Sequence, residues 1–366
     1  MVPATESAAV PSTLLSLLLS LTLALGILLP AESAWAYLPP GNAITDPAAL
    51  LRDALPVQQP DLEDLQHRLE ATSEDLRARR WSGLRSSCGR TQQQLAQHQE
   101  AIVAALPQQR QGQASDTLGQ LKGQLEQLCT AADQQDRDGF LSLRRQALAS
   151  IGASEALFVE DFPFQIPEEF QALPRLLGRA TVQLSTNKGD LTLVVDGYNA
   201  PLTAGAFVDL VQRGFYDGLG FNRAEDFYVL QTGDPKGPET GFVAPGSKSV
   251  RPVPLEIRAP GIAAPYYNET FEELGLFKTT PVLPFAAKGT LGWAHSDAAL
   301  DDGSSQFFLF LFEPELTPAG LNLIDGRYAA FGYVVDGFDV LGELTVDDRI
   351  VSAKVLNGAE QLQPHG

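Results

Sequence analysis

The spacing of apolar residues changes once along this chain of 366 residues, near Phe162. Before Phe162, leucines recur every three or four residues, which places them on one face of an α-helix. After it, apolar and polar residues alternate, as in Ala180–Asp196, and a period of two is typical of half-buried β-strands. The sequence therefore predicts a multidomain α + β fold, with a helical bundle followed by a β-domain.

The leucine-rich half contains signals for several helices. Asp46 followed by Pro47 is typical of a helix N-cap and first turn. We expect helices over 61–76 and Gln92–Leu106, a third capped by Ser115, and a fourth over Asp138–Ser150. The stripe on the first of these predicts a buried face at Leu62, Leu65, Leu69, Thr72 and Leu76. A dimerising coiled coil is the alternative, but Pro and Gly interrupt the stripes, which favours an intramolecular bundle.

The N-terminus reads as an export signal. The apolar run Ser12–Leu29 is followed by Ala34-Trp35-Ala36, a small-x-small cleavage pattern that would leave Tyr37 first; an uncleaved anchor is the alternative. Export bears on Cys88 and Cys129, which either bridge two helices in an oxidising compartment or remain reduced. Two cysteines and scattered histidines do not make a four-ligand zinc site, so we expect no metal. The formal net charge of -19 argues against nucleic acid or an anionic membrane surface as the main partner.

The second half begins after a proline-spaced linker over residues 161–179. Asn187-Lys188-Gly189 predicts a hairpin turn, and Thr203–Arg213 predicts a helix. Short strands and Gly-rich turns continue to about Leu356, a pattern that suits a closed antiparallel barrel.

Three blocks in this half resemble the cyclophilin-type peptidyl-prolyl cis-trans isomerases. They are FNRAEDFYVLQTGDP, GTLGWAHSDAALDDGSSQFFLF and IDGRYAAFGYVVDGFDVL, and the resemblance covers about Ala180–Gly358. It implies an eight-stranded closed antiparallel β-barrel with two capping helices and a substrate groove on its outer face. It also implies isomerase (rotamase) activity on proline-containing polypeptides with no cofactor.

The chemistry agrees with such a site. Rotation about a peptide C–N bond faces a barrier of roughly 18–20 kcal/mol, because nitrogen shares its lone pair with the carbonyl. A catalyst must hold the proline ring in an apolar pocket and bind the twisted amide better than the planar one. A guanidinium aimed at the prolyl nitrogen does so, since a pyramidal nitrogen accepts a hydrogen bond and a conjugated one hardly does.

The resemblance assigns residues to these tasks. Arg223 matches the catalytic arginine, while Gln231 and Gln306 match polar groups that position the substrate. Gln306 stands at the head of the apolar run Phe307–Phe312, and we expect its amide to face a bound peptide backbone or to orient Arg223, rather than to be satisfied inside the barrel. The expected substrate-binding residues are Tyr228, Val229, Ala294, His295, Phe308, Leu323, Ile324 and Tyr328.

Four of these positions depart from the family pattern. Tyr228 stands where Phe is usual, His295 where Asn is common, Leu323 where many members carry Trp, and Tyr328 where they carry His. The floor and the arginine remain, but the walls differ, so we expect an isomerase whose activity is weak.

An insert of about 50 residues, Lys236–Lys288, separates the first two blocks and contains PLEI and EELG. With the helical half, it is similar to the forty-kilodalton thylakoid-lumen cyclophilin-like proteins of oxygenic phototrophs. That resemblance implies a lumenal folding factor or chaperone that supports photosystem II assembly or maintenance by acting on lumenal loops of photosystem proteins. The alternatives are a catalytically weak binding module, whose helical domain covers or regulates the groove, and a periplasmic foldase.

These inferences divide the chain into a signal peptide (1–36), a helical bundle domain (37–160), a linker (161–179), an isomerase domain (180–358) and a C-terminal tail (359–366). Peripheral membrane association and a contact between bundle and barrel stay open.

Overall fold

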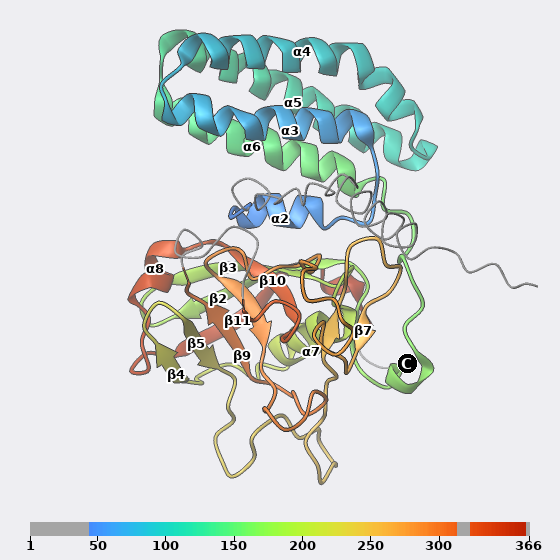
Figure 1. Ribbon diagram of the computed structural model, residues 1–366, viewed down its shortest axis with the longest axis vertical. Coiled ribbons are helices and arrows are strands. Elements are labelled where there is room, and N and C mark those ends of the chain that lie inside the picture. Colours follow the sequence, from blue (N-terminus) through green and yellow to red (C-terminus); the bar gives the residue numbers. More distant parts are fainter. Residues whose placement is uncertain (1–43, 313–322, 364–366) are drawn as a thin grey trace, which may run out of the picture. The chain divides into compact units, whose positions relative to one another are not determined.

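The computed structural model describes residues 44–312 and 323–363 (Figure 1). The expected signal peptide lies outside the described residues. In the part of the chain that is described, no helix is both long and apolar enough to cross a membrane. The helices of the first half are α2 (Pro47–Asp53), α3 (Pro60–Arg77), α4 (Trp81–Ala104), α5 (Gln108–Gln134) and α6 (Arg137–Ala156).

Helices α3 to α6 pack around a core of their own. The five residues of the predicted stripe on α3 are all buried, and Leu118, Leu121, Leu125 and Leu128 of α5 are fully buried. The leucine faces are therefore used inside the chain, which confirms the bundle over the coiled coil. Asp46 caps α2 as expected, its carboxylate accepting a hydrogen bond from the amide of Ala48 at 2.9 Å.

The sequence predicted the first residue of two helices incorrectly. Helix α4 begins at Trp81 rather than Gln92, because its buried stripe (Leu84, Cys88, Thr91, Leu95) includes polar types that an apolar pattern overlooks. Helix α5 begins after Pro107 rather than at Ser115. The hydroxyl of Ser115 donates to the carbonyl of Gln111 one turn earlier, so this serine lies within the helix.

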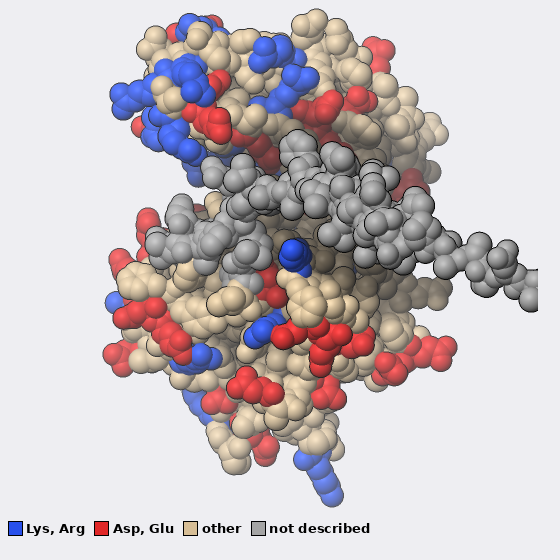
Figure 2. Space-filling view, viewed as in Figure 1, with Lys and Arg blue, Asp and Glu red and all other residues tan. Residues whose placement is uncertain are grey.

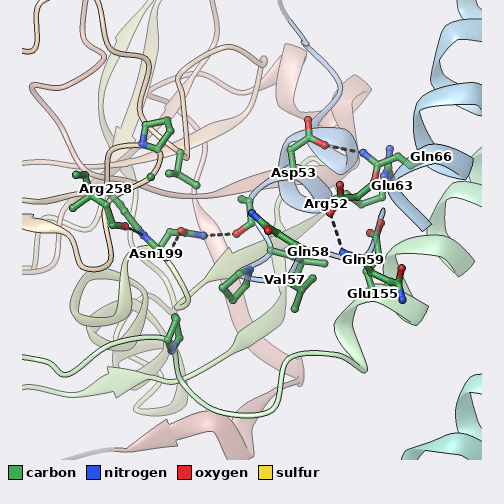
Figure 3. A pocket seen from close by; sticks show the side chains of 18 of the residues that line it. Arg52, Asp53, Val57, Gln58, Gln59, Glu63, Gln66, Glu155, Asn199 and Arg258 are labelled. Carbon is green, nitrogen blue, oxygen red and sulfur yellow. Dashed lines mark hydrogen bonds between the residues drawn. The ribbon is translucent and has the colours of Figure 1, made fainter. Parts of the chain in front are cut away.

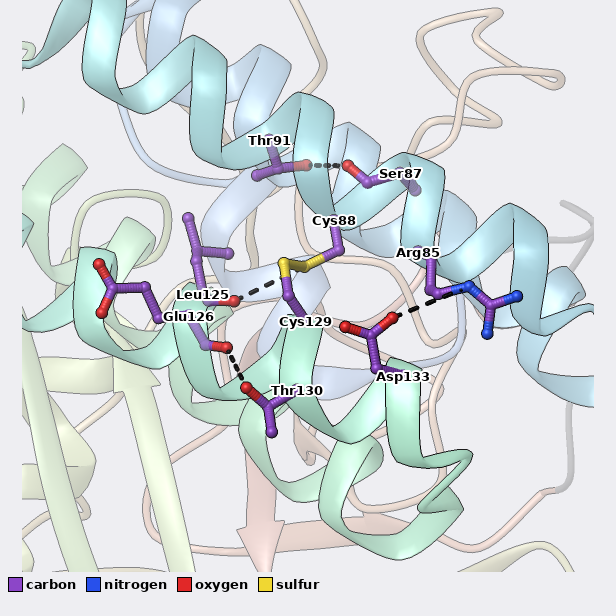
Figure 4. The surroundings of a disulfide bond; sticks show 9 residues. All are labelled: Arg85, Ser87, Cys88, Thr91, Leu125, Glu126, Cys129, Thr130 and Asp133. Atoms are coloured by element: carbon purple, nitrogen blue, oxygen red, sulfur yellow. Dashed lines mark hydrogen bonds and ion pairs between the residues drawn. A yellow bond between two sulfur atoms is a disulfide. The ribbon is translucent and has the colours of Figure 1, made fainter.

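A disulfide joins Cys88 of α4 to Cys129 of α5, with the two Cα atoms 5.6 Å apart (Figure 4). The two residues are separated by 41 positions. Closing a loop of that size restricts the unfolded chain and stabilises the folded one by about 4 kcal/mol in the chain-entropy model. The bridge thus holds together two helices of the bundle.

The second half is built on one eight-stranded antiparallel sheet, in the order β11-β2-β3-β10-β8-β9-β5-β4. Helices α7 (Pro201–Gln212) and α8 (Phe338–Glu343) belong to this half, as expected. Two short pairs, β1–β12 (Arg175–Leu176 with Leu362–Gln363) and β6–β7 (Glu256–Ile257 with Tyr266–Tyr267), and the 3-10 turns Glu168–Phe170 and Ala359–Gln361 complete it. The strands of the main sheet are β2 (Arg179–Thr186), β3 (Asp190–Asp196), β4 (Phe221–Glu225), β5 (Val229–Thr232), β8 (Thr290–Trp293), β9 (Phe307–Phe310), β10 (Ala330–Asp336) and β11 (Ile350–Asn357).

The expected closed barrel is corrected to a curled sheet with two edges, β4 and β11. The two edges meet over a short stretch, where Gly220 bridges Arg349 and the amide of Ile350 donates to the carbonyl of Leu219 at 2.8 Å. In the same stretch the amides of Gly218 and Phe221 donate to the carbonyls of Ile350 and Asp348, at 2.9 and 3.4 Å. Beyond Phe221, the residues of β4 are exposed rather than paired with β11. The ladder therefore does not run around the full circumference.

Helix α2 packs into the core of the sheet domain and makes an ion pair with α3 of the bundle. Its Leu50, Leu51 and Ala54 pack with the strands, and the side-chain amide of Asn199 donates to the carbonyl of Ala54 at 2.8 Å. Its polar face meets α3, where Arg52 pairs with Glu70 at 2.8 Å. Figure 3 shows Arg52, Asn199 and other side chains around a hollow of about 970 Å³ beside this helix.

Glu155 of α6 also lines this hollow (Figure 3). Its side chain is 3% exposed, and neither carboxylate oxygen has a hydrogen-bond partner among the described residues. Burial raises the pKa of Glu155 from 4.5 to about 7, although the nearby charge of Arg52 opposes the shift. Between about pH 4.5 and 7, the folded protein therefore holds a proton on Glu155 that the unfolded chain has released.

We predict that Glu155→Gln changes the pH dependence of stability. Between about pH 4.5 and 7 the folded state binds more protons than the unfolded state, so this group lowers the free energy of unfolding as pH rises. The variant should match the wild type near pH 4 and exceed it by on the order of 3 kcal/mol at pH 8. Urea unfolding followed by fluorescence at both pH values measures this. The exposed Glu100→Gln serves as the control, and an equal gain at both pH values would contradict the assignment.

Candidate active site

Four neighbouring strands bring the predicted site residues into one row. Arg223 of β4 pairs with Gln231 of β5, Gln231 pairs with Phe308 of β9, and Phe308 pairs with Gly292 of β8. Directly opposed residues share a face of the sheet. The register therefore aligns a guanidinium, an amide and an aromatic ring across that face.

The ring of Phe308 lies over Gly292. A Cβ added at Gly292 would be 2.2 Å from the ring's Cζ, so the backbone here needs a residue without a side chain. Phe285 stacks against Phe308 with 5.7 Å between ring centroids, and Tyr328 meets it edge-on at 5.6 Å. Phe308 is thus fixed as an apolar surface, 5% exposed.

A hollow of about 270 Å³, here called the groove, opens above this row. It is lined by nine of the eleven residues expected for the site. These are Arg223, Tyr228, Val229, Gln231, Ala294, His295, Phe308, Ile324 and Tyr328, together with Ser296 and Asp297.

Two expected residues lie elsewhere. Leu323 is 88% exposed and lines a different hollow, although it is adjacent in sequence to Ile324. Gln306 is absent from the lining, and its amide is fully used within the protein. Its oxygen accepts hydrogen bonds from Asn222 at 3.1 Å and Gln231 at 2.8 Å, and its nitrogen donates to Asp234 at 3.1 Å and to the carbonyl of Thr240 at 2.9 Å. Gln306 therefore orients Gln231 rather than presenting free polar atoms to the groove.

Arg223 carries the positive charge of the groove and is about half exposed. Its Nε and Nη2 donate to the same carboxylate oxygen of Glu225, at 2.8 and 2.6 Å. This exposed pair holds the guanidinium at the rim and competes with any other acceptor. Glu225 was not singled out from the sequence, although its position two residues along the same strand places it on the same face.

The histidine of the groove is held by backbone and by stacking. The ring of His295 stacks on Tyr328, with centroids 4.6 Å apart. Its Nδ1 lies 2.8 Å from the carbonyl oxygen of Ser296, and its Nε2 lies 3.1 Å from that of Arg327. The imidazole therefore forms part of a wall shared with Tyr328.

The insert is bound into the sheet domain. Glu256, 1% exposed, accepts hydrogen bonds from the amides of Leu202 and Thr203 at 3.1 Å and so caps the first turn of α7. Burial raises the pKa of Glu256 to about 8, opposed by these hydrogen bonds. Farther along, the insert supplies Phe285, which stacks behind the groove floor.

Among the residues that the structure describes, His, Cys, Asp and Glu side chains form no set that could hold a metal ion.

Comparison with known proteins follows the same division of the chain. Residues 181–357 match the family model for cyclophilin type peptidyl-prolyl cis-trans isomerase/CLD. A protein of Synechocystis sp., named provisionally as a thylakoid lumen peptidyl-prolyl cis-trans isomerase, is 49% identical over 353 residues, which cover 96% of this chain and 93% of that protein. The chain belongs to the cyclophilin-type peptidyl-prolyl cis-trans isomerase family. The resemblance stated from the sequence is confirmed.

Further relatives of this cyclophilin share its helical half. Residues 46–159 match a model described as the PsbQ-like domain of CYP38-like peptidyl-prolyl cis-trans isomerases. The chloroplastic peptidyl-prolyl cis-trans isomerase CYP38 of Arabidopsis thaliana is 39% identical over 88% of this chain and 76% of its own length. A solved cyclophilin of Cryptosporidium parvum is 20% identical and has a TM-score of 0.35, and the match covers 49% of this chain and 98% of that one.

We predict that Gly292→Ala lowers isomerase activity without touching Arg223. The new methyl group displaces the Phe308 ring, and a displacement near 1 Å costs up to about 100-fold in rate, so kcat/KM should fall about 10-fold or more. The measurement is cis/trans exchange of a short Ala-Pro peptide by NMR. Gly342→Ala in α8, where an added Cβ meets nothing within 4 Å, is the matched control. Unchanged exchange in a folded Gly292→Ala variant would contradict this role of the glycine.

A second prediction concerns Glu225→Gln. Removing the carboxylate charge frees the guanidinium of Arg223, so kcat/KM should rise about 2- to 5-fold at low salt. The gain should shrink as ionic strength increases, because exposed charges are screened. Asp226→Asn, which changes a neighbouring exposed carboxylate, is the control. A fall in activity would mean that Glu225 positions Arg223 rather than competing for it.

Proposed function

We propose that this chain catalyses cis–trans isomerisation of X–Pro bonds in exported or membrane-protein loops. The observation that carries the proposal is the shared lining of the groove by Arg223, Gln231 and Phe308. A cation, an amide and an apolar floor on one face meet the requirements of a reaction that forms no covalent intermediate.

In the proposed mechanism the proline ring rests on Phe308, between Val229 and Ile324. Gln231, held by Gln306, hydrogen-bonds to the substrate backbone beside the rotating bond. As the bond twists, the prolyl nitrogen becomes pyramidal and its lone pair accepts a hydrogen bond from the guanidinium of Arg223. This contact exists in the transition state and hardly in the planar ground state, so it lowers the barrier.

We further propose that the protein acts in the thylakoid lumen, on lumenal loops of photosystem proteins, and supports photosystem II assembly or maintenance. Support comes from the names of two relatives, one of the thylakoid lumen and one chloroplastic, and from the export signal read in residues 1–36. The periplasm is the alternative compartment. The domain bounds proposed from the sequence, 37–160 and 180–358, are kept in this proposal.

Charge bears on the partners. Acidic side chains are spread over the visible face of the sheet domain in Figure 2, in keeping with the net charge of -19. Such a surface repels nucleic acid and favours polypeptide partners. Peripheral membrane association would therefore depend on a protein partner rather than on anionic lipid.

A second candidate function is a binding module with little catalysis. The pairing of Arg223 with Glu225, and Leu323 exposed where many family members carry Trp, favour it. In that case the groove grips proline-bearing loops and the helical domain regulates access. Every described residue that lines the groove belongs to the sheet domain. The described helices therefore do not cover the groove, and the helical domain would regulate access through α2 and the core of the sheet domain.

We predict that Arg223→Ala lowers kcat/KM for a short Ala-Pro peptide by about 10- to 150-fold, the equivalent of one charge-assisted hydrogen bond. Arg223→Lys should recover only part of the loss, because an ammonium lacks the planar fork. Exchange NMR on the chain from Tyr37 onward measures all three proteins. Equal rates in wild type and Arg223→Ala would remove Arg223 from its role, and no exchange in the wild type would favour the binding module.

A further inference from the structure

The segment Leu323–Tyr328 separates two hollows. Ile324 and Tyr328 line the groove, whereas Leu323, Asp325 and Arg327 line a second hollow of about 300 Å³. Because Ile324 lies between Leu323 and Asp325 in sequence, the two hollows share a wall that is one chain thick.

The opposite side of the second hollow comes from the insert. Phe271 is buried, while Phe277 is 71% exposed and faces the same hollow as the exposed Leu323. Large apolar side chains exposed together at a concavity are typical of a binding surface. The remaining lining residues are Glu272, Leu276, Lys278, Thr279 and Thr280.

Three contacts fasten the insert to the shared wall. The amide of Phe271 donates to the carbonyl of Gly326 at 2.9 Å, and the amide of Phe285 donates to the carboxylate of Asp325 at 2.7 Å. Arg327 pairs with Glu272 at 2.7 Å. Gly326 has a φ of +76°, and a Cβ there would lie 2.6 Å from the Cβ of Phe271, so insert and wall approach as closely as glycine allows.

We propose that the second hollow is a specificity subsite for a large apolar side chain of the same polypeptide whose proline lies in the groove. An extended peptide advances about 3.3 Å per residue, so crossing the shared wall takes about two to four residues. The occupant is the client itself, because the hollow lies next to the groove across one wall and exposes the apolar side chains of Leu323 and Phe277. This inference rests on the proposed use of the groove.

The test measures binding of synthetic peptides to the chain from Tyr37 onward by titration calorimetry. Each 11-residue peptide has one central Pro in an Ala and Ser background, and one Leu is moved through the other positions. We expect Leu at one position, two to four residues from Pro, to lower Kd about five-fold or more relative to the Leu-free peptide.

Variants of the hollow separate this subsite from general stickiness. Phe277→Ser removes an exposed side of the hollow, and Thr280→Trp fills it; both should abolish the gain from Leu. Binding and isomerisation of a short Ala-Pro peptide should stay unchanged in both. Val351→Ser, which removes an exposed apolar side chain on β11, is the matched control and should keep the gain.

Three outcomes would overturn the subsite. These are no gain at any Leu position, a gain that survives both variants, and a gain that persists when Pro is replaced by Ala. Sedimentation that shows a dimer in the wild type and a monomer in Phe277→Ser would overturn it as well, by making the hollow an interface between copies. Failure of the proposed function is distinguishable, because it appears as absent exchange of the short peptide while the Leu-dependent gain in affinity is still measured.

Discussion

The close approach of the Phe308 ring to Gly292 is the constraint on which the groove depends. With no side chain at Gly292, the ring can lie flat across the next strand and offer an apolar floor. Strand register then determines the rest, because Gln231 is paired beside Phe308 and Arg223 beside Gln231. Backbone pairing thus sets the separation between floor and cation without a direct bond between them.

The floor is also supported from behind by a segment far away in sequence. Phe285, near the end of the insert, stacks on Phe308, and its backbone amide is held by Asp325 of the opposite wall. The insert therefore supports the floor of the groove and is not merely a surface loop. Burial raises the pKa of Asp325 to about 6, and the hydrogen bond from the amide of Phe285 opposes the shift.

Much of this arrangement was predictable from the sequence, for physical reasons that also mark its limits. The two spacings of apolar residues separated the helical bundle from the sheet domain. A period of two also placed Val229, Gln231 and Phe308 on the face of the sheet that lines the groove. The partners of Gln306 were not predictable, because Asn222, Asp234 and Thr240 lie 66 to 84 residues away and meet it only through folding. Leu323 lines the second hollow, because adjacent residues on an irregular segment point into different hollows. Sheet closure was overestimated, because the end of β4 is exposed to solvent.

The cap that Glu256 places on α7 makes the insert inseparable from the domain. The carboxyl group of Glu256, which comes from the insert, accepts hydrogen bonds from two amides that the helix itself cannot pair. Deleting the insert would therefore leave the amides of Leu202 and Thr203 buried without a hydrogen-bond acceptor. The domain can therefore lose the insert only if another hydrogen-bond acceptor takes the place of Glu256 at the start of α7.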